Sequence, residues 1–226
     1  MARHDFAADL NEIDSKVREL FSLVSQGLAA ATDAFLASDR EIATAVIARD
    51  RTIDQLYVDI EDLVQTQFAL QAPAAVDMRY LLSMLRIVPE IERSGDLVEH
   101  IAKRAMRAVA EELSPRARGL VERMGQVGVI LWEGAAQAYA ERSASSFEHL
   151  SNLDDELDEL HVSFTAEIVD SEPSIPVAIE AALVARFYER LGDHAVNIAS
   201  RMRYVAIGEG SSLKEPWTPK EPSTAQ

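Results

Sequence analysis

The strongest constraint on the fold is a segment that occurs twice. The stretch IERSGDLVEHIAKR begins at Ile91, and a similar stretch, YERLGDHAVNIASR, begins at Tyr188. Both carry Glu-Arg, Gly-Asp and Ile-Ala at matching places, with an offset of 97 residues from Asp96 to Asp193. Upstream, RDRTIDQL and LDDELDEL match at a second offset, 104 residues from Asp54 to Asp158. Self-similarity of this kind indicates a tandem duplication of one structural unit.

Hydrophobic periodicity predicts that each unit consists of helices. Residues 1–72 contain no proline and a single glycine, Gly27. Apolar residues recur there in steps of three and four, typical of an amphipathic helix, at Leu10, Ile13, Val17, Leu20, Val24, Leu28, Ala31 and Phe35. Asp39 is expected to cap a second helix that runs toward Pro73, and a third helix is expected from about Ala75 to about Ala110.

The second half repeats this organisation. Ser114 followed by Pro115 predicts an N-cap and a proline at the first helical position. Further helices are expected over residues 115–141, 144–170 and 176–207, and no segment shows a sustained strand period. The expected fold is all-α, with two tandem three-helix bundles at residues 1–112 and 113–207. Residues 208–226, including Trp217, are rich in proline and glycine and are predicted to form a disordered tail.

Composition excludes several functional classes. The formal net charge is −16 and the isoelectric point is near 4.7, so nucleic acids and anionic membrane surfaces are poor partners. The chain has no cysteine, which excludes disulfides, thiolate metal sites and a cysteine nucleophile. Because the N-terminus lacks an apolar leader segment, a cytoplasmic protein is expected. Phosphate loops, nucleophile elbows and His-Glu-x-x-His motifs are missing, which favours a protein that is not an enzyme.

Repeated acidic pairs are the best candidates for a functional site. Each half carries two pairs of acids spaced four residues apart, namely Asp50 with Asp54, Glu92 with Asp96, Asp154 with Asp158, and Glu189 with Asp193. This spacing places both carboxylates of a pair on one helix face, where like charges repel. A bound cation would relieve the repulsion, and oxygen donors suit magnesium, manganese, iron or zinc without selecting one. The alternative is that these are ordinary solvated charges.

Two sequence details favour a site over solvated charges. Gly95 and Gly192 immediately precede the second acid of their pairs, although glycine inside a helix costs about 1 kcal/mol relative to alanine. Something must therefore approach the helix closely there, and the sequence leaves open whether it is another helix or a ligand. Apolar stripes also run by helical steps into the acids, through Leu81, Leu85 and Val88 toward Glu92, and through Ala178, Ala182 and Ala185 toward Glu189.

Two other readings of the acids remain open. Asp158 and His161 lie three residues apart and form a single D-x-x-H motif. Carboxylate-bridged di-iron bundles use glutamate and histidine at the same spacing. A metal-dependent helical oxidase is therefore the alternative function. His100 extends the acidic stripe from Glu92, but a core or capping hydrogen bond is the simpler role for it. A scaffold that needs no metal is the third reading.

The duplicated motif, with the upstream stretch QAPAAVDMRYL, resembles the PhoU family of bacterial phosphate-signalling regulators. The resemblance covers about residues 8–207. It implies two three-helix bundles, often dimeric, with metal ions held by E(D)xxxD pairs. At matching positions it implies Asp50, Asp54, Glu92 and Asp96 for one site, and Asp154, Asp158, Glu189 and Asp193 for the other.

For function, the resemblance implies a regulator of phosphate uptake. It would couple the ATPase subunit of the Pst phosphate transporter to a PhoR-type sensor kinase, keep the phosphate-starvation response off, and reach the membrane only through these partners. The chain departs from the family pattern in its first half. Pro89 is expected to kink the helix before Glu92, and Ser94 occupies a position that is usually aliphatic. The second site is therefore the better match.

Overall fold

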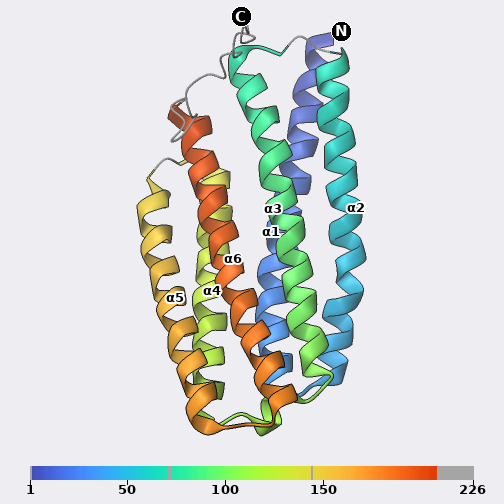
Figure 1. Cartoon of the computed structure of the whole chain (residues 1–226). Helices are drawn as coiled ribbons and strands as arrows, with labels where there is room; N and C mark the ends of the chain where they lie inside the picture. The colour runs from blue at the N-terminus through green and yellow to red at the C-terminus, as the bar shows by residue number, and fades with distance from the viewer. Residues whose placement is uncertain (1, 71–72, 144, 208–226) are drawn as a thin grey trace, which may run out of the picture.

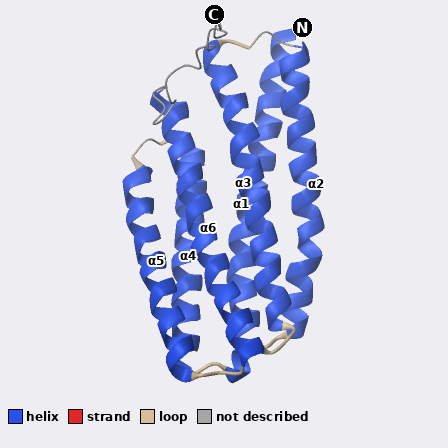
Figure 2. Cartoon of the chain, viewed as in Figure 1, coloured by secondary structure: helices blue, strands red, loops and turns tan. Residues whose placement is uncertain are grey.

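The computed structural model describes residues 2–70, 73–143 and 145–207, and helices dominate these ranges (Figures 1 and 2). The elements are α1 (Ala2–Ala37), α2 (Arg40–Leu70), α3 (Ala75–Ala105), the 3-10 helix η1 (Val109–Glu112), α4 (Pro115–Glu141), α5 (Ser146–Ser171) and α6 (Ile175–Ile207). No strand occurs in this part of the chain. The predicted all-α class and the six helices are confirmed. The predicted tail and its Trp217 lie outside the described residues.

Both predicted helix caps are confirmed. The Asp39 carboxylate accepts hydrogen bonds from the backbone N–H groups of Glu41 at 2.9 Å and Ile42 at 3.0 Å. The Ser114 hydroxyl accepts a hydrogen bond from the backbone N–H of Ala117 at 3.0 Å, and α4 begins at Pro115. These bonds satisfy backbone donors that a helix start leaves unpaired.

The predicted end of the third helix is wrong. α3 ends at Ala105 rather than near Ala110, and Ala108 adopts a left-handed conformation with φ 54° before η1 begins. Val109 and Ala110 are nevertheless buried, so the apolar pattern continues through the turn. The turn also lacks the glycine that normally marks such a stop.

Each half is a three-helix bundle, and the two bundles share one core. Within each half every helix packs on the other two, while α1 contacts α4 and α3 contacts α6 between the halves. Figure 1 places α2 and α5 at opposite edges of the molecule, with the other four helices between them. The core includes Trp132, Tyr139 and Tyr188, all at most 2% exposed.

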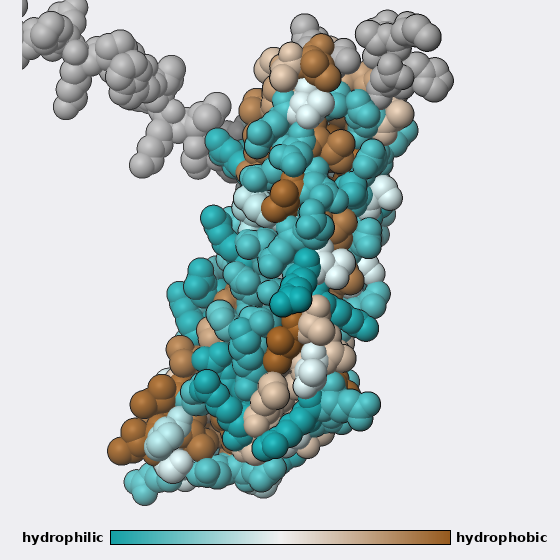
Figure 3. Space-filling model, turned by 90° about the vertical axis from the view of Figure 1, so that its right-hand side faces the viewer, coloured by the Kyte–Doolittle hydropathy of each residue, from teal (hydrophilic) through white to brown (hydrophobic). Residues whose placement is uncertain are grey.

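The apolar face predicted for α1 lies in this core. Seven of its residues are fully buried, at Ile13, Val17, Leu20, Val24, Leu28, Ala31 and Phe35. By length and composition, Phe6–Ala37 would also qualify as a membrane span, but half of its apolar window is buried inside the protein. The buried stripe is that of an amphipathic core helix. The molecular face seen in Figure 3 is mainly hydrophilic, with one apolar patch at its lower left and smaller apolar groups scattered over the rest.

Polar contacts also join the two halves. Thr32 on α1 and Tyr188 on α6 share a buried hydrogen bond of 2.7 Å, and Tyr80 on α3 pairs with Tyr139 on α4 at 3.0 Å. Gly125 lets α4 approach Thr32, because a methyl group at this glycine would overlap the threonine side chain. These contacts fix the relative position of the bundles, and thereby of the acidic pairs on them.

Candidate metal-binding clusters

The predicted acids lie along two separate helix seams. Asp50 and Asp54 on α2, with Glu92 and Asp96 on α3, form what we call the first acidic cluster. Asp154 and Asp158 on α5, with Glu189 and Asp193 on α6, form the second acidic cluster. α2 packs on α3 and α5 packs on α6, so each cluster lies within one half of the molecule. The duplication has therefore produced two equivalent acidic seams.

In the first acidic cluster, the carboxylates perturb one another. Burial, and after it the charges of Glu99, Asp54 and Asp96, together raise the pKa of Asp50 to about 6. Burial, followed by the neighbouring acids, also raises the pKa values of Glu92 and Asp96. A charged carboxylate is disfavoured when it loses water and faces other negative charges.

The second acidic cluster is perturbed more strongly. Burial raises the pKa of Asp154 to about 7, and the charges of Asp193 and Asp158 are the next largest causes. Burial also raises the pKa of Glu189. The exposed positions are Asp158 and Asp193, whereas Asp154 and Glu189 are half-buried.

Two oxygens of the second acidic cluster are buried without a hydrogen-bond partner among the described residues. They are Asp154 Oδ1 and Glu189 Oε2. The other oxygen of Glu189 accepts a hydrogen bond from Arg186. An unpaired buried carboxylate oxygen is costly, so this site has unused capacity to bind a cation.

The two glycines of the repeated segment, Gly95 and Gly192, have different neighbours. A methyl group at Gly95 would lie 2.9 Å from Ile53 Cδ1, so this glycine serves the packing of α2 on α3. At Gly192 a methyl group would collide with Asp154 Oδ1 and would lie 2.9 Å from Leu157 Cδ2. The packing explanation thus accounts for Gly95. Gly192 additionally makes room for a carboxylate of the second acidic cluster.

The apolar stripes only partly lead inward. Leu81 and Val88 are buried as expected, but Ala182 is exposed. The acids therefore lie at the rim of the core rather than inside it. His161 is half-buried and its charge lowers the pKa of Glu189, while the His100 ring packs against Phe187 with centroids 5.5 Å apart.

The donor set fits a hard cation, although the side chains are not drawn together around one. No group of three or more Asp, Glu or His side chains within the described ranges already has metal-binding geometry. Every predicted ligand supplies carboxylate oxygens, which suit magnesium, manganese, iron or zinc. Arg186 pairs with one oxygen of Glu189, but Asp154 Oδ1 and Glu189 Oε2 have no partner among the described residues, and the pKa of Asp154 is raised.

Sequence reasoning missed two features beside the clusters. Glu99 is the neighbour whose charge most strongly raises the pKa of Asp50, after burial. Its spacing of three residues from Asp96 is the signal that would have found it. Ser94 forms a buried hydrogen bond of 2.7 Å with His194, which explains a serine at a position expected to be aliphatic. No sequence pattern signals a pair formed across the two halves.

Comparison with known proteins places the chain in a family. The model of the PhoU domain matches it twice, at residues 17–105 and 121–202. The chain belongs to the PhoU family. The two PhoU matches coincide with the two halves of the internal repeat, and the resemblance seen in the sequence is confirmed.

Similar proteins support the assignment over most of the chain. The phosphate-specific transport system accessory protein PhoU homolog 1 of Mycobacterium leprae is 32% identical, covering 91% of this chain and 94% of its own. Homolog 2 of Mycobacterium tuberculosis is 31% identical, covering 91% and 98%. The crystal structure of PhoU from Pseudomonas aeruginosa superimposes with a TM-score of 0.84 at 27% identity, covering 90% of this chain and all of that one. The phosphate transport system regulatory protein PhoU from Streptococcus pneumoniae gives 0.80 at 25% identity, covering 92% and 100%.

Proposed function

We propose that this chain is a non-enzymatic regulator of phosphate uptake that works by binding partners. Its PhoU relatives are named accessory proteins of the phosphate-specific transport system, and they align over about nine tenths of the chain. In this proposal the protein is cytoplasmic, acts as a homodimer, and couples the transporter ATPase subunit to a PhoR-type sensor kinase. Through these partners it keeps the phosphate-starvation response off.

The second acidic cluster is the proposed control point. The observation that carries this is the pair of buried carboxylate oxygens, Asp154 Oδ1 and Glu189 Oε2, that have no hydrogen-bond partner among the described residues. Asp154, Asp158, Glu189 and Asp193 would hold the cation, and the equivalent residues of the first acidic cluster would hold another. A bound divalent or trivalent cation would neutralise the local negative charge. The helices α5 and α6 would then present a less acidic surface to a partner.

A reporter assay tests this proposal. A phosphate-starvation reporter is measured in high-phosphate medium, in a deletion strain complemented with wild type or with Glu189→Ala/Asp193→Ala. The deletion is expected to derepress the reporter, and the double variant is expected to leave it derepressed at normal protein level. Full repression by the double variant would remove the acidic cluster from the function. A silent reporter in the deletion strain would contradict the regulatory role itself.

One further variant separates this proposal from the carboxylate-bridged oxidase considered above. His161→Ala removes the imidazole near Glu189 but keeps all four carboxylates. A regulator that uses the carboxylates alone should retain repression with this variant. Loss of repression together with redox-active iron in the purified protein would favour the oxidase instead.

A further inference from the structure

A groove of about 440 Å³ lies on the seam between α3 and α6, and none of the eight clustered acids lines it. Its charged wall consists of Arg86, Arg93, Arg201 and a single acid, Glu90, and its apolar wall includes Leu85 and Ile198. The charged side chains of the wall therefore sum to a positive charge, in a protein whose overall formal charge is −16.

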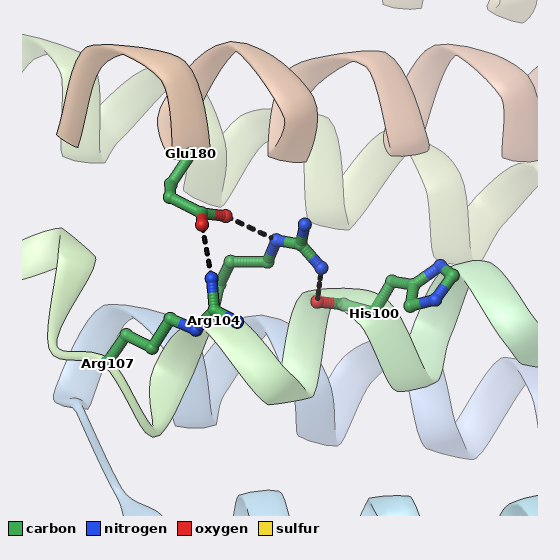
Figure 4. Close-up of polar contacts among 4 residues, drawn as sticks. All are labelled: His100, Arg104, Arg107 and Glu180. Atoms are coloured by element: carbon green, nitrogen blue, oxygen red, sulfur yellow. Dashed lines mark hydrogen bonds and ion pairs between the residues drawn. The ribbon is translucent and has the colours of Figure 1, made fainter. Parts of the chain in front are cut away.

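Elsewhere along this seam, facing charges are complementary. Arg104 and Arg107 on the α3 side both bind Glu180 on α6, with Arg104 Nε 2.9 Å from the Glu180 carboxylate (Figure 4). One step further along, Ser94 pairs with His194. At the groove, by contrast, Arg86 from α3 and Arg201 from α6 line the same wall, and within the described residues neither forms an ion pair.

The acid in the groove wall is already engaged. Glu90 Oε2 lies 3.5 Å from His194 Nε2, and Glu90 Oε1 lies 3.8 Å from Arg93 Nη1. Its carboxylate is thus directed to His194 and Arg93 rather than to the other two arginines of the wall. Arg86 and Arg201 retain positive charge that this wall does not balance.

The unbalanced positive charge in the groove affects Arg201. The side chain is half-buried, with its guanidinium 5.7 Å from the ring centroid of Tyr204. Burial lowers the pKa of Arg201, and the charge of Arg86 lowers it further. The two guanidinium groups are therefore close enough to repel, and an anion between them would remove the repulsion.

We propose that this groove binds a phosphoryl oxyanion, which Arg86 and Arg201 hold between them with Arg93 alongside. A guanidinium presents a planar fork of N–H donors that matches phosphate oxygens two at a time. A phosphate dianion supplies more charge and more acceptors than one carboxylate, which suits a groove lined by three arginines. The apolar wall next to the arginines can accommodate either free orthophosphate or the organic part of a phosphate ester. The site lies on a different seam from the clusters and does not depend on a metal.

Titration calorimetry on the full-length protein tests the proposal. The protein is treated with a chelator, so that phosphate cannot bind through metal ions, and is titrated with sodium phosphate and, separately, with sulfate at equal ionic strength. Wild type should bind phosphate saturably and more tightly than sulfate. Arg86→Gln and Arg201→Gln should each weaken binding by at least about tenfold, as expected for the loss of a charge-assisted contact.

Two control variants separate the site from general effects of charge. Arg40→Gln removes an exposed arginine at the start of α2, outside the groove, and should leave phosphate binding unchanged. Arg86→Lys/Arg201→Lys keeps the charges but loses the planar forks, and should bind more weakly than wild type while remaining folded by circular dichroism.

Adenosine monophosphate distinguishes the two sources of the phosphoryl group. Tighter binding of the nucleotide than of orthophosphate, lost in the same arginine variants, would identify a phosphate ester as the ligand. The reverse order would identify orthophosphate. Absence of saturable binding by both, equal binding by the Gln variants and wild type, or sulfate binding as tight as phosphate would each overturn the proposal.

Discussion

Ser94 Oγ on α3 and His194 Nδ1 on α6 lie 2.7 Å apart across the seam between the two halves. Both side chains are buried, with Ser94 fully inaccessible and His194 6% exposed. Each lies one residue from a glycine-aspartate pair of the repeat, since Ser94 precedes Gly95 and His194 follows Asp193. The bond thus ties the two repeated segments to each other.

Removing this bond should destabilise the protein. Ser94→Ala leaves a buried imidazole nitrogen without its partner, which costs about 1–3 kcal/mol of unfolding free energy. In a double-mutant cycle with His194→Ala, measured by urea unfolding, we expect a coupling energy of about 0.5–3 kcal/mol. Purely additive effects would show that the contact contributes nothing beyond the separate side chains.

The raised pKa of Asp154 should make the unfolding free energy depend on pH. Its pKa is about 7 in the folded protein, against an ordinary value of 3.8. Between these values the folded chain binds more protons than the unfolded chain, so this group lowers the unfolding free energy as pH rises from about 4 to about 7. His194 acts in the opposite direction. Burial, then Arg190 and Arg93, lowers its pKa from 6.5 to about 4, so its stabilisation is lost as pH falls through that range.

Comparing wild type with Asp154→Asn isolates the aspartate, because the effect of His194 is common to both proteins. With chelator present at pH 8, the variant should have a larger unfolding free energy than wild type, as measured by urea unfolding. The difference should shrink steadily toward pH 5 as wild-type Asp154 becomes protonated. Parallel stability curves across this range would contradict the raised pKa.

The two repeat glycines should respond differently to alanine. Gly192→Ala forces the Asp154 carboxylate to move, so it should reduce any stabilisation of the protein by added manganese or magnesium. Gly95→Ala would crowd buried Ile53, 2.9 Å from Cδ1 and 3.1 Å from Cγ2, which offsets the gain in helix propensity of about 1 kcal/mol, but it should leave the stabilisation by the cation unchanged. Thermal unfolding with and without the cation measures both. Equal loss of the cation effect in the two variants would argue against the special role of Gly192.

Much of the fold could be predicted because helical periodicity and capping are local. The spacing from Ile13 to Phe35 places these residues on one face, and that face is buried. Ser114 and Pro115 marked a helix start for a chemical reason that requires no tertiary context. The end of α3 could not be predicted, because the left-handed turn at Ala108 uses an alanine and the apolar pattern continues beyond it.

The candidate site was only partly accessible from sequence. Spacing placed each acidic pair on one face, and the duplication indicated that the pairs belong together. Which carboxylates become buried depends on how α5 packs on α6, so the difference between half-buried Asp154 and exposed Asp193 required the structure. The groove arginines, Arg86 and Arg201, come from separate halves and carry no shared motif.

The central claim, that the second acidic cluster holds a cation, is tested most directly by metal binding to the purified protein. Wild type and Glu189→Ala/Asp193→Ala are stripped with chelator, dialysed against manganese, magnesium, iron or zinc, and analysed for bound metal. Asp39→Asn, which removes an acidic charge at a helix cap outside the clusters, serves as the control. Wild type and the control should retain metal at the same stoichiometry, and the double variant should lose the share held by the second acidic cluster. Equal metal content in the double variant and wild type would contradict the claim.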